Sequence, residues 1–260
     1  MLQRAQAARS QGCPHEVIRV LSSDAPVVED SLRTEPSLEL DRLVLLGIAY
    51  HDIGRPLEAA DALERASLIG PIADEARIAL ASSYAELRRI DLARELYLQL
   101  ALSRRLSSEL MLQVAAGLAA IDAPQLAMQV CEWITENDDG VAQAYYDMGV
   151  YSASSGNQLY LTEALTRRAL ELDSANVHYR IGLVSLLIQL RREDEALAAL
   201  DETTLEQIQA IECSPCLARI AALLSRHRKT RLARACVRRL ADLEAAEADR
   251  AVALNGGRWR

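Results

Sequence analysis

The side chains best suited to chemistry lie in the segment 212–240, ECSPCLARIAALLSRHRKTRLARACVRRL. Cys213 and Cys216 have the spacing of paired zinc ligands, and His227 and Cys236 would complete a tetrahedral site. The same C-x-x-C pair suits redox chemistry if it lies at a helix N-terminus, where the pKa of a thiol falls. A third interpretation makes Cys216 and Cys236 small buried residues on helices. The third is favoured, because the spacing to His227 is unfamiliar and a thioredoxin-like strand–helix–strand context is missing.

The same segment is strongly basic and contains no acidic residue after its first position. Its cations are Arg219, Arg226, Arg228, Lys229, Arg231, Arg234, Arg238 and Arg239. Three of them, Arg231, Arg234 and Arg238, fall on one helical face. They would suit an acidic or phosphate-rich partner, or they form a solvated face whose stems cover apolar surface. Salt-sensitive pairing with the acidic stretch 24–39, within one chain or between two copies, is a further alternative.

Sequence motifs for catalysis are absent. The chain has no glycine-rich phosphate loop, no Gly-x-Ser-x-Gly elbow and no HExxH helix. Its four histidines, His15, His51, His178 and His227, are far apart in the sequence. We therefore expect a protein that is not an enzyme and that needs no cofactor.

Composition narrows the class of protein further. The formal net charge of −8 argues against a general nucleic-acid binder. No apolar run is long enough to span a membrane, and the N-terminus lacks the apolar core of a signal peptide. The five cysteines are odd in number and scattered, which argues against a disulfide framework and favours a reducing cytoplasm.

The elements that must position these residues follow a repeat of 34 residues. The repeating columns are Leu46, Leu80, Val114 and Met148; Gly47, Ala81, Ala115 and Gly149; Tyr50, Tyr84 and Leu118; and Ala59, Ala93 and Ala127. The register then slips by one residue, which we place in the stretch SASSGNQLY. Apolar residues within each repeat have helical spacing, interrupted at Gly54 and Pro56 and closed at Pro71.

Each repeat is therefore predicted to form two antiparallel helices, with essentially no sheet. Two helices approach closely only where the side chains at their crossing are small, so Gly47, Ala59 and Ala66 are predicted crossing points. Neither helix of a pair can bury its apolar face alone, so each pair must lean on its neighbour.

The spacing resembles that of the tetratricopeptide repeat family. One repeat reads Leu46, Gly47, Tyr50, Ala59, Leu63, Ala66 and Pro71, and the next reads Leu80, Ala81, Tyr84, Ala93 and Tyr97. The stretch TEALTRRALELDSAN also looks like a second helix and exit turn of this family, whereas Cys131 and Asp139 depart from its pattern. The resemblance implies an all-α, right-handed superhelical solenoid of about six or seven helix pairs. It also implies a protein-interaction scaffold or adaptor.

The repeat parse divides the chain into five parts. Residues 1–31 are predicted to form a degenerate helix pair, with Gly12 at the place of Gly54, and residues 32–39 an acidic linker. Five repeats follow in 40–208, then an irregular pair with a capping helix in 209–254, and a frayed tail in 255–260.

In such a stack the first helix of each pair lines the concave face, which is where we expect a peptide groove. Its predicted lining residues are Val44, Ile48, Ile78, Ser82, Leu112, Tyr146 and Ile181. An acidic edge is predicted from Asp41, Asp52, Glu75, Glu86 and Glu109. Such a groove would bind an amphipathic or basic segment of another protein, or of a second copy in a homo-oligomer.

Both columns have plainer interpretations. The carboxylates near the starts of helices would complement helix dipoles, and the apolar stripe would be packing between neighbouring pairs. A carboxylate clamp for chaperone C-termini is not expected, because Val44, Ile48, Ile78 and Ser82 occupy the positions where such clamps carry lysine and asparagine.

Overall fold

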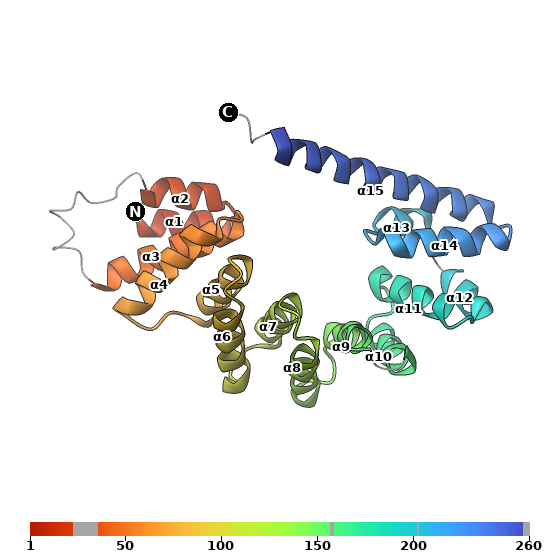
Figure 1. The fold of residues 1–260 in the computed structure, drawn as a ribbon, viewed down its shortest axis with the longest axis horizontal. Coiled ribbons are helices and arrows are strands. Elements are labelled where there is room, and N and C mark those ends of the chain that lie inside the picture. The colour runs from red at the N-terminus through yellow and green to blue at the C-terminus, as the bar shows by residue number, and fades with distance from the viewer. Residues whose placement is uncertain (23–35, 157–158, 202, 257–260) are drawn as a thin grey trace. The chain divides into compact units, whose positions relative to one another are not determined.

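The computed structural model describes residues 1–22, 36–156, 159–201 and 203–256, with side chains up to Ala248. In these ranges the chain forms α-helices and no strand (Figure 1), so the predicted all-α fold is confirmed. The helices are α1 (Leu2–Ser10), α2 (Pro14–Ser22), α3 (Pro36–Asp52), α4 (Pro56–Ile69), α5 (Asp74–Glu86), α6 (Ile90–Ser103), α7 (Ser108–Ala120), α8 (Pro124–Asn137), α9 (Ala142–Ser154), α10 (Leu159–Leu172), α11 (Val177–Gln189), α12 (Glu193–Leu200), α13 (Leu205–Gln209), α14 (Ser214–Arg226) and α15 (Thr230–Gly256). None of these helices combines the length and apolarity needed to cross a lipid bilayer.

Short turns join the two helices of each pair. Three residues connect α3 to α4, α5 to α6 and α7 to α8. The stretch SASSGNQLY, where the extra residue of the slipped register is predicted, includes residues 157–158, which lie outside the described residues. A left-handed residue recurs in the turns, and it is glycine at positions 12, 54 and 156 and another residue type at Arg88, Asp122, Arg191 and Arg228. Gly12 and Gly54 thus occupy equivalent turn positions, with φ of 66° and 69°.

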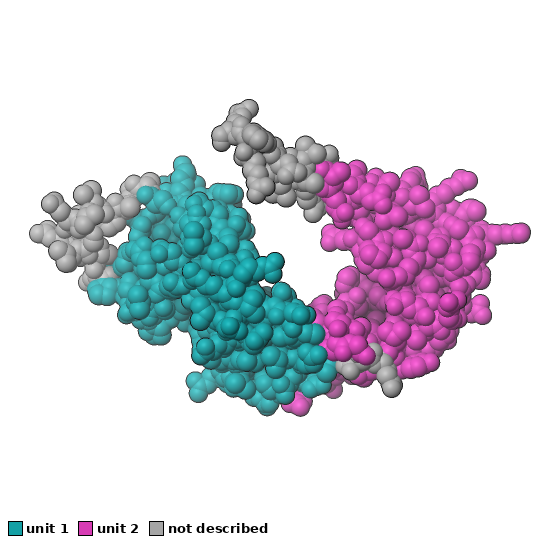
Figure 2. All heavy atoms as spheres, viewed as in Figure 1, with its two compact units in different colours: residues 1–134 teal, residues 135–260 magenta. Residues whose placement is uncertain are grey.

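The chain divides into two compact units, residues 1–134 and 135–260 (Figure 2). In the first unit one apolar cluster contains residues of the four helices α1, α2, α3 and α4, and a second contains residues of α3, α4 and α5. In the second unit a single cluster joins α11 to α15 around Leu187, Leu200 and Leu224. Each unit therefore has a core of its own, and the division falls near the end of α8, within a predicted repeat.

Small residues mark the crossing of α3 and α4, as predicted. Ala59 and Ala66 have no exposed surface, and Gly47 is buried. A β-carbon built on Gly47 would lie 2.4 Å from Cγ of Leu63 and 3.3 Å from the carbonyl oxygen of Ala59. The two helix backbones are thus too close for any larger residue at this position unless Leu63 moves.

An ion-pair network joins α10 to α12 in the second unit. Glu163 is only 7% exposed, and its two oxygens accept hydrogen bonds from Arg167 Nε at 2.9 Å and from Arg192 at 2.6 Å. Both arginines also contact Glu195. The buried carboxylate is therefore fully compensated, as a charge removed from water must be.

Several predicted boundaries differ from the structure. Helix α3 begins at Pro36, so residues 36–39 of the predicted linker are helical; proline is compatible with a first helical turn. The predicted capping helix is wrong as a separate element, because α15 runs unbroken over Thr230–Gly256. This helix also takes in the first two residues of the predicted tail, and residues 257–260 lie outside the described residues.

Candidate peptide-binding site

The first helices of three successive pairs form one surface of the first unit. Helix α3 contacts α5, and α5 contacts α7. Two adjacent cavities of about 760 and 380 Å³ open on this surface and share His51, Ile78 and Gln113. Seven predicted site residues line them: Ile48, Asp52, Glu75, Ile78, Ser82, Glu86 and Glu109. We call this surface the α3–α5–α7 face.

The apolar floor of the face is narrower than predicted. Ile48 and Ile78 are 8% and 7% exposed, and Ile181 of the second unit is 3% exposed. Ile48 packs in the cluster that joins α3 to α5, and Ile181 packs in the cluster of the second unit. Ile48 and Ile181 therefore pack between helices, and all three isoleucines offer a partner little exposed apolar surface. Their assignment to a peptide groove stays a prediction.

The other predicted groove residues differ in their surroundings. Val44 is half-buried between the two apolar clusters of the first unit, and Leu112 is half-buried on α7 without lining either cavity. Tyr146 lies in the second unit, where its ring contacts the rings of His178 and Tyr179, each at 4.9 Å between centroids. A β-carbon on Gly182 would come within 2.8 Å of the Tyr146 ring, so this side chain is also packed against its neighbour helix.

Carboxylates give the face its chemical character. Glu75 accepts a hydrogen bond from Arg9 of α1 at 2.7 Å, and Asp52 lies 3.3 Å from Nδ1 of His51. Glu86 and Glu109 are exposed and form no ion pair among the described residues. Asp41 is exposed and does not line either cavity, so it stays apart from the others.

The positions of these carboxylates on their helices show which of them can be explained by stabilisation of a helix dipole and which cannot. Glu75 and Glu109 lie in the first turns of α5 and α7, where a carboxylate complements the helix dipole. Asp52 and Glu86 are the last residues of α3 and α5. A negative charge at a helix C-terminus is unfavourable, so the dipole does not explain this second pair of carboxylates.

The lining of the site also includes residues that were not predicted from the sequence. Arg9, Arg88 and Gln113 line the cavities. Arg9 belongs to the degenerate first pair and reaches Glu75 across a sequence separation of 66 residues. Arg88 is the left-handed residue of the α5–α6 turn, a position that the repeat columns mark through Gly54.

A hydrogen-bonded cluster on α9 and α11 surrounds Asp147 in the second unit. Gln143 donates to Oδ1 of Asp147 at 2.7 Å and accepts from the hydroxyl of Tyr179 at 2.8 Å. Burial raises the pKa of Asp147 above its usual value, although the hydrogen bond from Gln143 and the charge of His178 oppose this rise. Burial also raises the pKa of Tyr146 to about 12.

The raised pKa of Asp147 makes a pH-dependent prediction. The protonated Asp147 makes its full contribution to the unfolding free energy at pH values below the carboxyl pKa of the unfolded chain. This contribution is lost as the pH rises through the higher pKa of the folded state. Asp147→Asn should therefore stabilise the second unit at neutral pH and have no effect at acid pH. Urea unfolding between about pH 3.5 and 7.5 measures this difference, with the exposed Asp91→Asn as the control. A difference that is constant with pH would contradict the assignment.

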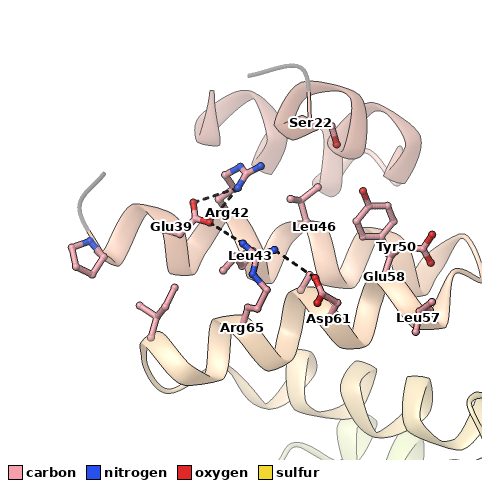
Figure 3. Close-up of a pocket in the computed structure, with 13 residues that line it drawn as sticks. Ser22, Glu39, Arg42, Leu43, Leu46, Tyr50, Leu57, Glu58, Asp61 and Arg65 are labelled. Atoms are coloured by element: carbon pink, nitrogen blue, oxygen red, sulfur yellow. Dashed lines mark hydrogen bonds and ion pairs between the residues drawn. The ribbon is translucent and has the colours of Figure 1, made fainter. Parts of the chain in front are cut away.

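A larger cleft of about 1020 Å³ lies along α3 and α4 (Figure 3). Leu43, Leu46 and Ala62 contribute apolar surface, and the charged residues of its lining are all paired, Glu58 with Arg55 outside the lining. Arg42 bonds Glu39 at 3.2 Å and the carbonyl of Leu21 at 3.1 Å, and Arg65 lies 3.5 Å from Asp61. These mutually compensated charges give the cleft no preference for a charged ligand.

The proposed zinc ligands are not brought together. Cys213 and Cys216 form a disulfide at the N-terminus of α14. His227 follows the end of that helix and contacts Glu193 at 3.1 Å, whereas Cys236 is fully buried in the apolar cluster. No group of three metal-binding side chains occurs in the described part of the chain. The zinc hypothesis is therefore wrong for this set, and Cys236 is a buried core residue whose pKa burial raises to about 11.

The disulfide was not expected from the scattered cysteines, and it can be tested directly. Alkylation followed by mass spectrometry should label the exposed Cys13 of the unreduced protein and leave Cys213 and Cys216 unlabelled. Reduction should lower the unfolding free energy by about 2 kcal/mol, the loop-closure value for so short a loop. Cys13→Ser, which leaves the disulfide intact, is the control. Labelling of Cys213 without reduction would contradict the pairing.

Comparison with known proteins agrees on the fold. No family model matches the sequence, and no curated protein matches it. Among solved structures, a tetratricopeptide repeat protein from Parabacteroides merdae is 14% identical, with a TM-score of 0.65 over 93% of this chain and 91% of its own. PilF of Pseudomonas aeruginosa is 16% identical, with a TM-score of 0.61 over 82% and 99%. MamA is 18% identical, with a TM-score of 0.52 over 65% and 94%. The chain thus has the helical-repeat fold of the tetratricopeptide repeat proteins.

Proposed function

We propose that the chain is a protein-interaction scaffold that binds a basic or amphipathic segment of a partner on the α3–α5–α7 face. One observation carries the proposal: Asp52 and Glu86 place carboxylates at helix C-termini beside two cavities. A bound lysine or arginine would relieve the unfavourable interaction of these carboxylates with the helix dipoles.

The same face explains how a segment would be held. Cationic side chains of the partner would pair with Glu86 and Glu109, which form no ion pair among the described residues. Ser82 and Gln113 add hydrogen-bonding groups, and the edges of Ile48 and Ile78 add limited apolar contact. Affinity would then depend strongly on ionic strength, because exposed pairs are screened by salt. The expectation that the chain is not an enzyme stays a prediction.

A charge-reversal experiment tests this proposal. The probe is a labelled basic amphipathic peptide of lysine and leucine, titrated with the full chain and followed by fluorescence anisotropy. Glu86→Lys/Glu109→Lys should weaken binding by at least about tenfold, which corresponds to about 1.4 kcal/mol.

The matched control is Asp91→Lys/Glu95→Lys on α6, which changes the net charge equally at exposed positions outside both cavities. It should change the affinity by less than about twofold. Circular dichroism checks that both variants keep their helicity. An equal loss in the two variants would show that only net charge matters, and the α3–α5–α7 face would lose its assignment.

A further inference from the structure

The basic segment of α14 and α15 contains two classes of cation. Four of them have partners: Arg219 donates to Ser185, Arg226 to Glu193, Lys229 to Asp201, and Arg239 to the carbonyl of Ile211. The other four are Arg228, Arg231, Arg234 and Arg238, which we call the arginine stripe. All four are exposed, and none forms a hydrogen bond or ion pair with its side chain in the described part of the chain.

This concentration of free guanidinium groups is unusual within the chain. Most other arginines in the described ranges contact a carboxylate, as Arg42, Arg89 and Arg167 do. Elsewhere among the described residues Arg88, Arg105 and Arg191 also lack such contacts, and Arg104 packs over the ring of Trp133. The stripe places four within eleven positions of a chain whose net charge is −8.

The location of the stripe makes it unfavourable without an anion. Helix α15 begins at Thr230 and has no acidic residue in its first turn. The N-terminus of a helix carries partial positive charge, so Arg228 and Arg231 add like charges to it. Arg231, Arg234 and Arg238 then continue along one helical face over roughly 10 Å, taking 1.5 Å per residue. A bound anionic ligand would relieve both sources of repulsion.

The chemistry of the stripe favours carboxylates on a peptide. Guanidinium groups pair with carboxylates through two parallel hydrogen bonds. Nucleic-acid surfaces commonly add aromatic side chains for base stacking, but the sequence has no Phe, Tyr or Trp between Tyr179 and Trp259. A membrane-binding helix needs a row of large apolar residues, whereas Val237 is the one large exposed apolar residue described on α15.

We propose that the arginine stripe docks an acidic segment of a partner protein. This surface lies on the second unit and is opposite in charge to the α3–α5–α7 face of the first. The chain would then be a two-site scaffold that holds a basic segment on one unit and an acidic segment on the other. The inference goes beyond the function proposed above and does not rest on it.

The test uses the full chain and a labelled poly-glutamate peptide, followed by fluorescence anisotropy in a salt series. Arg231→Glu/Arg234→Glu/Arg238→Glu should weaken binding by at least tenfold, and the wild-type affinity should fall as salt rises. The matched control is Arg94→Glu/Arg105→Glu/Arg191→Glu, which carries the same charge change at arginines outside the stripe and outside both cavities of the α3–α5–α7 face. It should change the affinity by less than about twofold.

Further arms make each outcome decisive. Arg231→Gln/Arg234→Gln/Arg238→Gln neutralises the three charges without reversing them, and it should also weaken binding. The result therefore does not depend on the folding of the glutamate variant. Absence of wild-type binding to poly-glutamate, or an equal loss in the control, would overturn the proposal. Stripe-dependent binding that is tighter for RNA homopolymer or for phosphatidylserine vesicles would assign the surface to those ligands instead.

The last arm asks whether a second copy of the chain occupies the stripe. In sedimentation experiments without peptide, the wild type and the stripe variant should show the same association state. If the wild type self-associates and the stripe variant does not, the stripe binds another copy of the chain and the assignment to an acidic peptide is wrong. Binding of the basic peptide should persist in the stripe variant, so failure of this inference is distinguishable from failure of the proposed function.

Discussion

Gly47→Ala is expected to lower the unfolding free energy of the first unit by about 2 kcal/mol. The new β-carbon would lie 2.4 Å from Cγ of Leu63, a branch point that cannot swing aside as a flexible chain end would. Overpacking of this kind costs about 1–3 kcal/mol or more. The better helix propensity of alanine returns up to about 1 kcal/mol, so the net change is a loss.

Gly149→Ala provides the matched comparison, because Gly149 occupies the same repeat column on α9. Its β-carbon would meet its nearest neighbours, in Thr162 and Thr166, at 3.4 Å, which is ordinary van der Waals contact. This variant should gain up to about 1 kcal/mol from helix propensity. Urea unfolding followed by circular dichroism measures both. The same sign for the two variants would show that close helix approach does not select glycine at position 47.

Tyr97→Ala is expected to destabilise the first unit by about 3–5 kcal/mol, the range for removing a large buried ring. Tyr97 is 2% exposed and belongs to α6, but its ring packs against α7. A β-carbon on Gly117 of α7 would lie 2.2 Å from Cζ of this ring. The substitution therefore removes contact between successive pairs as well as contact within one pair. Amide hydrogen exchange should become faster in α7 as well as in α6.

Tyr97→Phe separates the ring from its hydroxyl. Burial raises the pKa of Tyr97 to about 12, although the Ser82 side chain opposes this rise. Phenylalanine keeps the ring and should cost no more than about 1 kcal/mol. A large loss in both variants would mean that the hydroxyl, and not the packing of the ring, holds α6 against α7.

The fold could be predicted from the sequence because close packing of helices constrains residue size at fixed positions. Gly47, Ala81 and Ala115 share a column and are all buried, and at Gly47 an added β-carbon would meet Leu63. The boundaries were harder to predict. Pro36 and the acids after it read as a linker, although they begin α3. The charged stretch ADLEAAEADRAVAL was predicted to be a separate capping helix, but no proline or glycine separates it from the start of α15.

The site could be predicted only in part, because a column identifies equivalent positions and not the direction that each side chain faces. Ile48 and Ile78 lie on the predicted helices, but the crossing between neighbouring helices turns them into the core. Arg9 has no repeat counterpart that would place it beside Glu75. Likewise, the C-x-x-C spacing is compatible with metal binding and with a disulfide, and the structure decides by placing Cys236 inside the core.

The repeat register slips by one residue between Gly149 and Val184, so this architecture accepts a change of length. An inserted residue within a helix would rotate everything after it by about 100° and turn buried side chains outward, whereas one in a turn leaves the phase of both helices intact. Lineages of such proteins can therefore gain or lose single residues between helices while their sequences diverge. A repeat whose period changes in this way is hard to detect by sequence comparison, whereas comparison of backbone structures still detects it.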